Sequence, residues 1–266
     1  MTFLNFLINC IPGLNNFLTD FFLSRKLFIK NTKVKKKEIL FSVRNFGRIT
    51  FVRASKFYEL EPETIEWIDG FKHNSLLLDI GANIGMYSLY AATQKHQVIS
   101  LEPNSLNFAH LNLNISDNNL NKLIKAFPLC AHQEKKISYL YHSKSLKFGG
   151  AHSTFDRNII DTGQPFESKF VSGSYSISVD DLSSELQKYP NYIKIDVDGN
   201  ELNVIQGMKK ILQNEHLLSI LVEINPEFEE HKKCLEIISK NFFLKNRYCS
   251  DNQKKVFNYI FIRKQV

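Results

Sequence analysis

The stretch from Leu76 to Gly85 constrains the fold of this chain more than any other part of the sequence. It begins as an apolar run that ends in Asp79-Ile80, which predicts a strand buried on both faces, and it continues into a turn with glycines at positions 81 and 85. Glycine permits backbone angles and close approaches that a Cβ would block, and a helix that starts after the turn offers free N–H groups to a ligand. The stretch therefore predicts a strand, a ligand-binding turn and a helix in succession.

A second apolar run, Val98–Leu101, ends in Glu102, 21 positions after Gly81. A carboxylate at an offset of about 20 residues binds the ribose hydroxyls in nucleotide-binding βαβ units. The turn lacks the Gly-Lys-Ser/Thr of a phosphate-binding loop, and Asn83 stands where a dinucleotide-binding turn has its middle glycine. The pattern favours a nucleoside ligand without a pyrophosphate.

Strand and helix patterns alternate through the rest of the chain, which predicts one doubly wound α/β sheet, mostly parallel, with an antiparallel hairpin at its C-terminal end. Strands are predicted at 76–80, 98–102, 124–129, 136–141, 174–179, 193–197, 217–224, 243–248 and 257–263. Helices are predicted at 59–69, 84–92, 105–112, from 180 with Asp180 as its N-cap, from about 200 to 212, and at 227–240. The polar segment 143–173 is predicted to be a long functional loop.

Residues 1–72 are predicted to form an N-terminal cap of helices and a small β-hairpin with strands at 39–43 and 48–53, and residues 73–266 the main domain. The first 23 residues are rich in Phe and Leu but are interrupted by Pro12 and Gly13. Their apolar runs are shorter than the roughly 20 residues needed to span a bilayer. This segment has no positive start and no small-residue cleavage site, so we expect no signal peptide. It is predicted either to dock on the protein as amphipathic helices or to lie on a membrane surface.

The net charge of +7 comes largely from lysines around 30–37 and basic residues near the C-terminus. These residues form either a solvated surface or a contact with an anionic partner such as a membrane. They are not interleaved with aromatic residues at a recognisable spacing, so no nucleic-acid partner is expected. The four cysteines include no C-x-x-C pair and are predicted to be free thiols in a reducing cytoplasm.

The second dense motif runs from Tyr192 to Leu202. Strand periodicity places Lys194, Asp196 and Asp198 on one side. Because buried charges are costly unless they are paired or used, Asp196 is predicted either to form an ion pair with Lys194 or to hold or deprotonate a substrate hydroxyl. Asp198 is predicted to cap the following helix, with Glu201 completing a capping box.

Four motifs together resemble the FkbM family of S-adenosylmethionine-dependent methyltransferases, and the resemblance covers about residues 74–264. The motifs are residues 76–85, 100–104, 193–202 and 221–225. The resemblance implies a class I methyltransferase fold, which is Rossmann-like, and S-adenosylmethionine as cofactor, with S-adenosylhomocysteine as product. It also implies O-methylation, often of sugars or other hydroxylated natural products.

The resemblance further implies that the turn after the first core strand lines the methionine part of the cofactor and that Glu102 binds the ribose hydroxyls. His132 stands where the family commonly has an acid near the adenine, and the family's Asp-Val-Glu-Gly reads Asp-Val-Asp-Gly at 196–199. The predicted cofactor residues are Asp79, Gly81, Ala82, Asn83, Gly85, Glu102, Pro103, Asn104, His132 and Asp196.

Methyl transfer from a sulfonium requires that the acceptor oxygen be aligned, that water be excluded and that one proton be accepted. Asp196 is the first candidate base, with Lys194 tuning its charge. Glu223 and His152 are alternatives, although Glu223 can instead bond a neighbouring helix and His152 can be a surface residue. No metal site is predicted.

The sequence thus predicts methylation of a hydroxyl on a saccharide or glycoconjugate precursor. One alternative is a nicotinamide-dependent oxidoreductase, which the missing middle glycine and the absence of a Tyr-x-x-x-Lys pair oppose. The other is a non-catalytic cofactor-binding module, which the joint presence of Asp79, Glu102 and Asp196 opposes.

Overall fold

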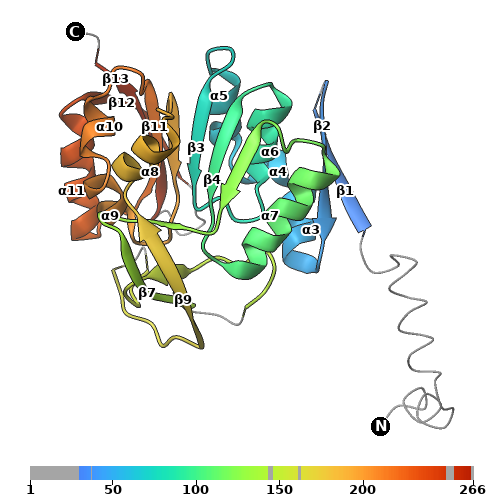
Figure 1. The fold of residues 1–266 in the computed structure, drawn as a ribbon, viewed down its shortest axis with the longest axis horizontal. Coiled ribbons are helices and arrows are strands. Elements are labelled where there is room, and N and C mark those ends of the chain that lie inside the picture. The colour runs from blue at the N-terminus through green and yellow to red at the C-terminus, as the bar shows by residue number, and fades with distance from the viewer. Residues whose placement is uncertain (1–29, 37, 143–145, 161–162, 250–254, 265–266) are drawn as a thin grey trace, which may run out of the picture.

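The structure, a computed structural model, describes residues 30–36, 38–142, 146–160, 163–249 and 255–264. Its centre is a seven-stranded sheet (Figure 1). In spatial order the strands are β12 (Phe242–Cys249), β13 (Phe257–Arg263), β11 (Ser219–Ile224), β10 (Tyr192–Ile195), β3 (Leu76–Ile80), β4 (Gln97–Leu101) and β5 (Ile124–Phe127). The strands from β11 to β5 are parallel, and β13 is antiparallel to both of its neighbours. The predicted mostly parallel sheet with an antiparallel C-terminal hairpin is confirmed.

Helices cover both faces of this sheet, so the protein has three layers (Figure 1). One face carries α3 (Arg48–Ser55), α4 (Phe57–Leu60), α5 (Pro62–Asp69), α6 (Met86–Thr93) and α7 (Ser105–Asp117). The other carries α8 (Val179–Leu186), α9 (Glu201–Gln206), α10 (Lys209–Gln213) and α11 (Glu229–Ser239). Successive residues of β3 enter opposite layers, Leu78 and Ile80 the second and Leu77 the first, because side chains alternate along a strand.

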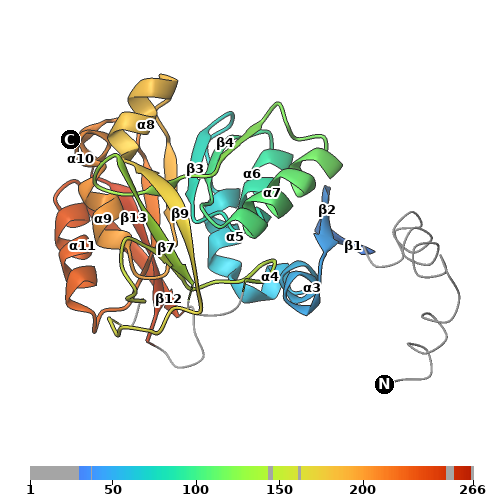
Figure 2. The same cartoon turned by 60° about the horizontal axis from the view of Figure 1, so that its bottom comes forward.

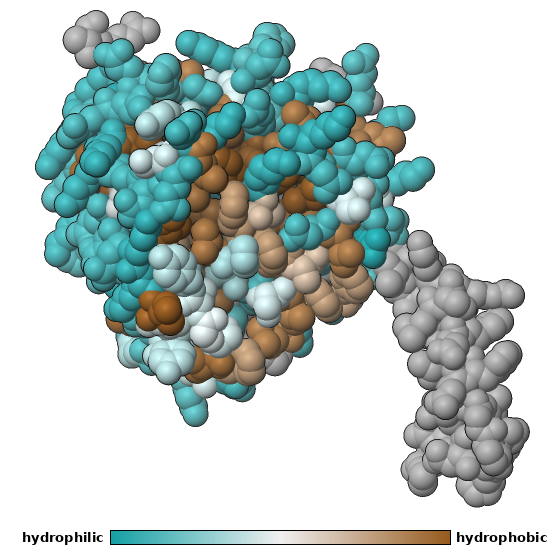
Figure 3. Space-filling model, in the orientation of Figure 1, coloured by the Kyte–Doolittle hydropathy of each residue, from teal (hydrophilic) through white to brown (hydrophobic). Residues whose placement is uncertain are grey.

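A second, four-stranded sheet begins just past the carboxyl end of β5. Its order is β6 (Cys130–Ala131), β9 (Phe170–Ile177), β7 (Lys136–His142) and β8 (Ser153–Phe155). Figure 2, in which this end of the molecule comes forward, shows β7 and β9 in front of the central sheet. On the face seen in Figure 3, white to brown side chains gather in the lower part, below a rim of hydrophilic ones.

The N-terminal hairpin exists, but its second predicted strand is wrong. Strand β2 (Ile39–Asn45) pairs with the preceding β1 (Lys30–Lys36), and residues 48–53 belong to helix α3. The alternating pattern was misleading because the apolar Ile49 and Phe51 are exposed, at 39% and 52%, while Thr50 and Ala54, four residues apart, face the core. The helices predicted within 1–23 lie outside the described residues. Within the described ranges, no helix is long and apolar enough to cross a membrane.

Three further local predictions need correction. The predicted loop 143–173 contains β8 and the start of β9, because each of them pairs with β7. Ser178, not Asp180, is the N-cap of α8, and the carboxylate of Asp180 accepts the N–H groups of Lys210 and Ile211 at the start of α10. Asp198 does not cap the helix after β10, whose N-cap position is Asn200.

Candidate functional site

The two dense sequence motifs leave the sheet side by side. The chain passes from β3 to β4 and β5 on one side and later returns to β10 on the other side of β3, so the strand order reverses between β3 and β10. Ligands of open α/β sheets bind beyond the carboxyl ends of the strands at such a point. Asp79 and Lys194 are opposite each other in the register, and the Asp196 N–H donates to the Ile80 carbonyl oxygen at 3.1 Å.

The turn after β3 requires glycine for two different reasons. Gly81, Asn83 and Gly85 all have left-handed backbone angles, with φ of 81°, 51° and 86°. A Cβ on Gly85 would lie 2.3 Å from the Leu111 Cδ1, so the leucine side chain of α7 would have to move to admit one. The N–H groups of Gly81 and Ala82 both donate to the Leu101 carbonyl oxygen at 3.0 Å, which fixes the turn against the end of β4.

A cavity opens at this edge of the sheet. Its first part combines the glycine turn with an acid and an apolar slot, formed by Gly81, Ala82, Asn83, Glu102, Pro103, Leu129, Cys130, Leu140 and Phe155. Its second part is rich in charged groups, with Arg53, Glu61, Tyr87, Lys194, Asp196 and Asp198. The first part of the cavity therefore suits a nucleoside, and it is continuous with a polar second part.

Glu102 lies at the end of β4 and is almost fully buried, at 5% exposure. Its Oε2 accepts the Asn83 N–H at 2.7 Å, and its Oε1 accepts the Asn104 N–H at 2.8 Å. Burial raises the pKa of the Glu102 carboxyl to about 7, although both backbone N–H groups favour the charged form. The carboxylate thus joins the glycine turn to the start of α7 and faces the cavity.

Lys194 forms the ion pair that strand periodicity predicted. Its Nζ lies 2.6 Å from the Asp196 Oδ2 and 5.0 Å from the centroid of the Tyr87 ring. The lysine side chain is only 3% exposed and that of Asp196 29% exposed. Burial alone would lower the pKa of Lys194, but the carboxylates of Asp196, Glu61 and Asp79 raise it above its ordinary value. Lys194 therefore stays charged beneath the polar part of the cavity.

Asp79 lies under the turn and does not line the cavity. Its Oδ2 accepts the Ser88 hydroxyl at 2.5 Å, and its Oδ1 has no hydrogen-bond partner among the described residues. Burial raises the pKa of this carboxyl, against the attraction of Lys194. A buried carboxylate oxygen without a hydrogen bond lowers the stability of the fold. A donor or a cation that arrives with a ligand could satisfy this oxygen.

The segment Phe148–His152 is tied down over the cavity from three elements. Asn107 of α7 accepts the Gly149 N–H at 2.8 Å through Oδ1 and donates to the Gly150 carbonyl at 2.9 Å. The Asn83 side chain donates to the same carbonyl at 3.0 Å, and the Arg53 Nε donates to that of Gly149 at 2.9 Å. The glycine turn, α7 and α3 thus hold this segment at the rim.

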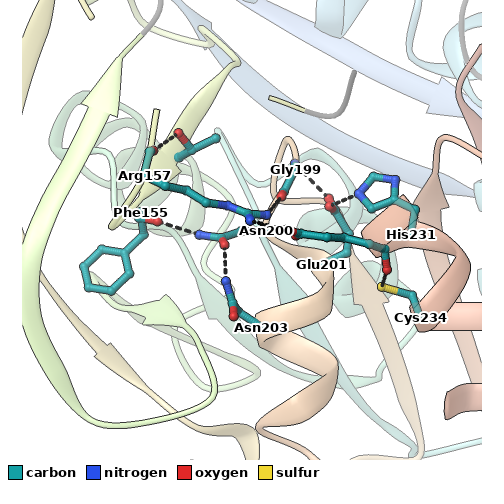
Figure 4. Close-up of polar contacts among 10 residues, drawn as sticks. Phe155, Arg157, Gly199, Asn200, Glu201, Asn203, His231 and Cys234 are labelled. Atoms are coloured by element: carbon teal, nitrogen blue, oxygen red, sulfur yellow. Dashed lines mark hydrogen bonds and ion pairs between the residues drawn. The ribbon is translucent and has the colours of Figure 1, made fainter. Parts of the chain in front are cut away.

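The turn after β10 is held from below by a buried pair on α9 and α11 (Figure 4). Glu201 Oε1 accepts the N–H groups of Val197 and Gly199 at 3.3 and 3.2 Å. Glu201 Oε2 lies 2.7 Å from the Nε2 of His231, whose Nδ1 accepts the Asn225 N–H at 2.8 Å. Because a backbone N–H can only donate, the proton of His231 is on Nε2. The predicted capping box is therefore wrong: Glu201 is the first residue of α9 and binds the backbone of Val197 and Gly199, not that of Asp198.

Comparison with known proteins identifies the family. A sequence model of the methyltransferase FkbM domain matches residues 79–248, which is more than half of the chain. The chain belongs to the FkbM methyltransferase family. It is 29% identical over 154 residues to the hexuronic acid methyltransferase AglP of Haloferax volcanii, a match that covers 58% of this chain and 57% of that protein.

Solved structures of methyltransferases share the fold. The FkbM methyltransferase of Methylobacillus flagellatus KT superposes with a TM-score of 0.50 at 15% identity, over 72% of this chain and 44% of that one. An rRNA methylase, described as putative, of Clostridium thermocellum superposes with the same TM-score at 13% identity, over 77% and 96% of the two chains. The fold is that of class I methyltransferases.

Several predicted site residues of this FkbM-family protein lie beside the cavity and do not line it. His132 packs its ring 5.5 Å from that of Phe155, and the Asn104 side chain caps α7. Glu223 is half-buried near the end of β11, where burial and the charge of Asp196 raise its pKa well above the ordinary value. His152 donates its N–H to the Asp198 Oδ2 at 2.6 Å. In the described part of the chain, no three or more His, Cys, Asp or Glu side chains are grouped to hold a metal.

Sequence reasoning missed the apolar slot of the cavity and three residues of its polar part, Arg53, Glu61 and Tyr87. Arg53 and Glu61 precede the segment that the family model matches, and Tyr87 lies in the helix predicted at 84–92 but was not among the predicted site residues. A charged residue just before Pro62 at the start of a helix is common, so Glu61 carried no distinctive signal. Only the packing of α3 to α5 against α6 places these side chains at the carboxyl edge of the sheet.

Proposed function

We propose that this protein transfers the methyl group of S-adenosylmethionine to a hydroxyl of a saccharide or glycoconjugate precursor. Membership in the FkbM family supports methyl transfer, and the similarity to a hexuronic acid methyltransferase supports a sugar acceptor. The observation that carries the proposal is the single cavity that runs from Glu102 to Asp196. A donor and an acceptor can meet there without crossing solvent.

The first part of the cavity fits the cofactor. Glu102 offers a carboxylate to the ribose hydroxyls, and the slot of Leu129, Leu140 and Phe155 offers apolar surface to the adenine. The unsatisfied Oδ1 of Asp79 lies beneath the turn on which the methionine part would rest. When bound, S-adenosylmethionine supplies a methyl group on a positively charged sulfur, which is already activated for transfer.

The chain's own residues then have three tasks. The segment Phe148–His152 excludes water from above, since Asn83, Asn107 and Arg53 hold it at the rim. The Lys194–Asp196 pair presents a fixed carboxylate at the point where the polar part of the cavity begins. Asp196 can accept a hydrogen bond from a hydroxyl of the acceptor and so help to orient the reacting oxygen toward the methyl group.

Isothermal titration calorimetry tests the cofactor. We expect micromolar dissociation constants for S-adenosylmethionine and S-adenosylhomocysteine and no heat with NAD. Binding of NAD alone would favour an oxidoreductase, and binding of neither sulfur compound would refute the proposal. Transfer of tritiated methyl groups is then measured with methyl glycosides of glucose, galactose and glucuronic acid as acceptors. Cofactor binding without transfer to any of these glycosides would refute the saccharide assignment.

A further inference from the structure

The second part of the cavity contains an acid that comes from outside the family segment. Glu61 lies between α4 and α5, and its carboxylate lines the cavity together with Tyr87 and Asp196. Its Oε2 accepts the Thr64 hydroxyl at 2.9 Å and the Asn258 side-chain N–H at 3.4 Å. The Tyr87 hydroxyl also donates to this carboxylate. Glu61 is thus held in place by α5, α6 and β13 and remains in contact with the cavity.

Charged groups surround Glu61 from every element packed around it. Burial raises the pKa of its carboxyl, and the nearby carboxylate of Asp196 raises it further, while Lys194 and the hydroxyls of Thr64 and Tyr87 lower it. The titratable and charged side chains around this region are Arg53 of α3, Tyr87 of α6, Asp79 of β3, Lys194 of β10, Asp196 and Asp198 of the turn after β10, and Glu223 of β11. The net effect is that the pKa of the Glu61 carboxyl is raised above its ordinary value, chiefly by burial.

Asp196 and Glu61 differ in what holds them. The Oδ2 of Asp196 lies 2.6 Å from the buried ammonium of Lys194, so this oxygen is already engaged by a fixed cationic partner. Among the described residues, Glu61 forms no ion pair within 4.0 Å, and its polar partners are hydroxyl and amide groups. Asp196 is therefore the better orienting group, and Glu61 the better proton acceptor.

We propose that Glu61 is the catalytic residue that accepts the proton of the acceptor hydroxyl. The inference rests on the proposed function and adds a residue to it. As the acceptor oxygen forms its bond to the methyl carbon, the S–CH₃ bond breaks and its electron pair stays on sulfur, which becomes a neutral thioether. The acceptor O–H bond breaks, its electron pair stays on oxygen, and the proton moves to the Glu61 carboxylate. Water later removes that proton.

This assignment gives the region before residue 72 a chemical role. Helices α4 and α5 place the base, and Tyr87 of α6 orients it by a hydrogen bond. The acceptor would then lie between Glu61 and the Asp196–Lys194 pair, with its reacting hydroxyl donating to Glu61 and a neighbouring hydroxyl donating to Asp196. An acceptor with several neighbouring hydroxyls, such as a sugar ring, suits a region with two carboxylates better than an isolated alcohol does.

The test compares Glu61→Gln with Glu63→Gln in the full chain. Glu63 is a matched control because it lies two residues further on, in α5, is buried, and accepts the Asn258 side-chain N–H at 2.9 Å, yet does not line the cavity. Affinity for S-adenosylhomocysteine, thermal unfolding, and the pH profile of tritiated methyl transfer to methyl glycosides are measured for each. Glutamine keeps the size of Glu61 and its acceptor oxygen but cannot take up the proton.

We expect Glu61→Gln to bind S-adenosylhomocysteine and to unfold like the wild type, but to transfer methyl groups about 100-fold more slowly. In the wild type, the transfer rate should rise with pH as Glu61 ionises. The pH profile of the variant should lack this rise. Glu63→Gln should keep both the rate and the profile. If the wild type transfers methyl groups and Glu61→Gln loses less than threefold in transfer rate, the inference is overturned and the proposed function stands. Absence of transfer in the wild type itself would overturn both.

Discussion

The carbonyl oxygen of Asp196 lies 1.8 Å from the point where a Cβ at position 81 would be. The two dense motifs of the sequence therefore meet backbone against backbone, and the glycine of the first is required by the position of the second. Since backbone atoms cannot yield as a flexible side chain does, this contact fixes the width of the cavity between the glycine turn and the Lys194–Asp196 pair.

Gly81→Ala should disrupt this contact. The methyl group meets the Asp196 carbonyl, and the left-handed φ of 81° adds roughly 1–2 kcal/mol of backbone strain for a residue with a Cβ. We expect lower stability in urea unfolding and loss of S-adenosylhomocysteine binding by calorimetry. Gly173→Ala is the control, because nothing lies within 4 Å of its Cβ position. Equal behaviour of the two variants would show that the turn can move away from Asp196.

Glu102 should make the protein less stable as the pH rises. Burial raises the pKa of its carboxyl to about 7 from an ordinary 4.5, so the native state holds the proton more tightly than the unfolded state does. This contribution is fully present below pH 4.5 and is lost as the pH rises through 7, with a total on the order of 3 kcal/mol. Urea unfolding of the wild type and of Glu102→Gln at pH 5 and pH 8 measures it. Because the glutamine does not ionise, parallel pH dependences would contradict the prediction.

The parts of the fold that sequence reasoning found are those with a local pattern. Apolar runs that end in an acid located β3, β4 and β10. Strand periodicity correctly predicted that Lys194 points to one side of β10 and that Ile193 and Ile195 point to the other. Helix α3 was missed because its exposed Ile49 and Phe51 imitate an alternating strand. Glu61 was missed for a different reason: its importance depends on contacts with Tyr87 and Asn258, which lie 26 and 197 positions away in the chain. No local pattern reports such contacts.

Asn107→Ala should release the segment at the rim of the cavity. Its side chain makes two hydrogen bonds to the backbone of Gly149 and Gly150 and is buried, so their loss should cost about 1–3 kcal/mol. We expect faster proteolysis near residues 146–152 and weaker S-adenosylhomocysteine binding. Asn112→Ala removes an exposed amide from the same helix, which among the described residues donates to the Phe108 carbonyl alone, and should change neither property. If both variants keep wild-type proteolysis rates, Asn83 and Arg53 alone suffice to hold the segment.

His231→Ala should loosen the turn after β10 from a distance. It removes the imidazole that accepts the Asn225 N–H and contacts the Glu201 Oε2, where both side chains of the Glu201–His231 pair are 1% exposed. We expect a loss of about 2 kcal/mol in stability and faster hydrogen exchange at the amides of Val197 and Gly199, which Glu201 holds. His216→Ala, on an exposed residue, is the control. Unchanged exchange at both amides would mean that Glu201 needs no support from His231.

Asp196→Asn tests whether the Lys194–Asp196 pair contributes to stability as well as to the reaction. The substitution leaves the ammonium of Lys194, 3% exposed, without its ion-pair partner at 2.6 Å, which should cost on the order of 3 kcal/mol. Adding Lys194→Met removes the unpaired charge, so the double variant should be more stable than Asp196→Asn alone and should still bind S-adenosylhomocysteine. Urea unfolding of the wild type, both single variants and the double variant gives the coupling energy. A coupling energy near zero would show that Glu61 and Asp79 are enough to keep Lys194 charged, and Asp196 would then be retained for the acceptor alone.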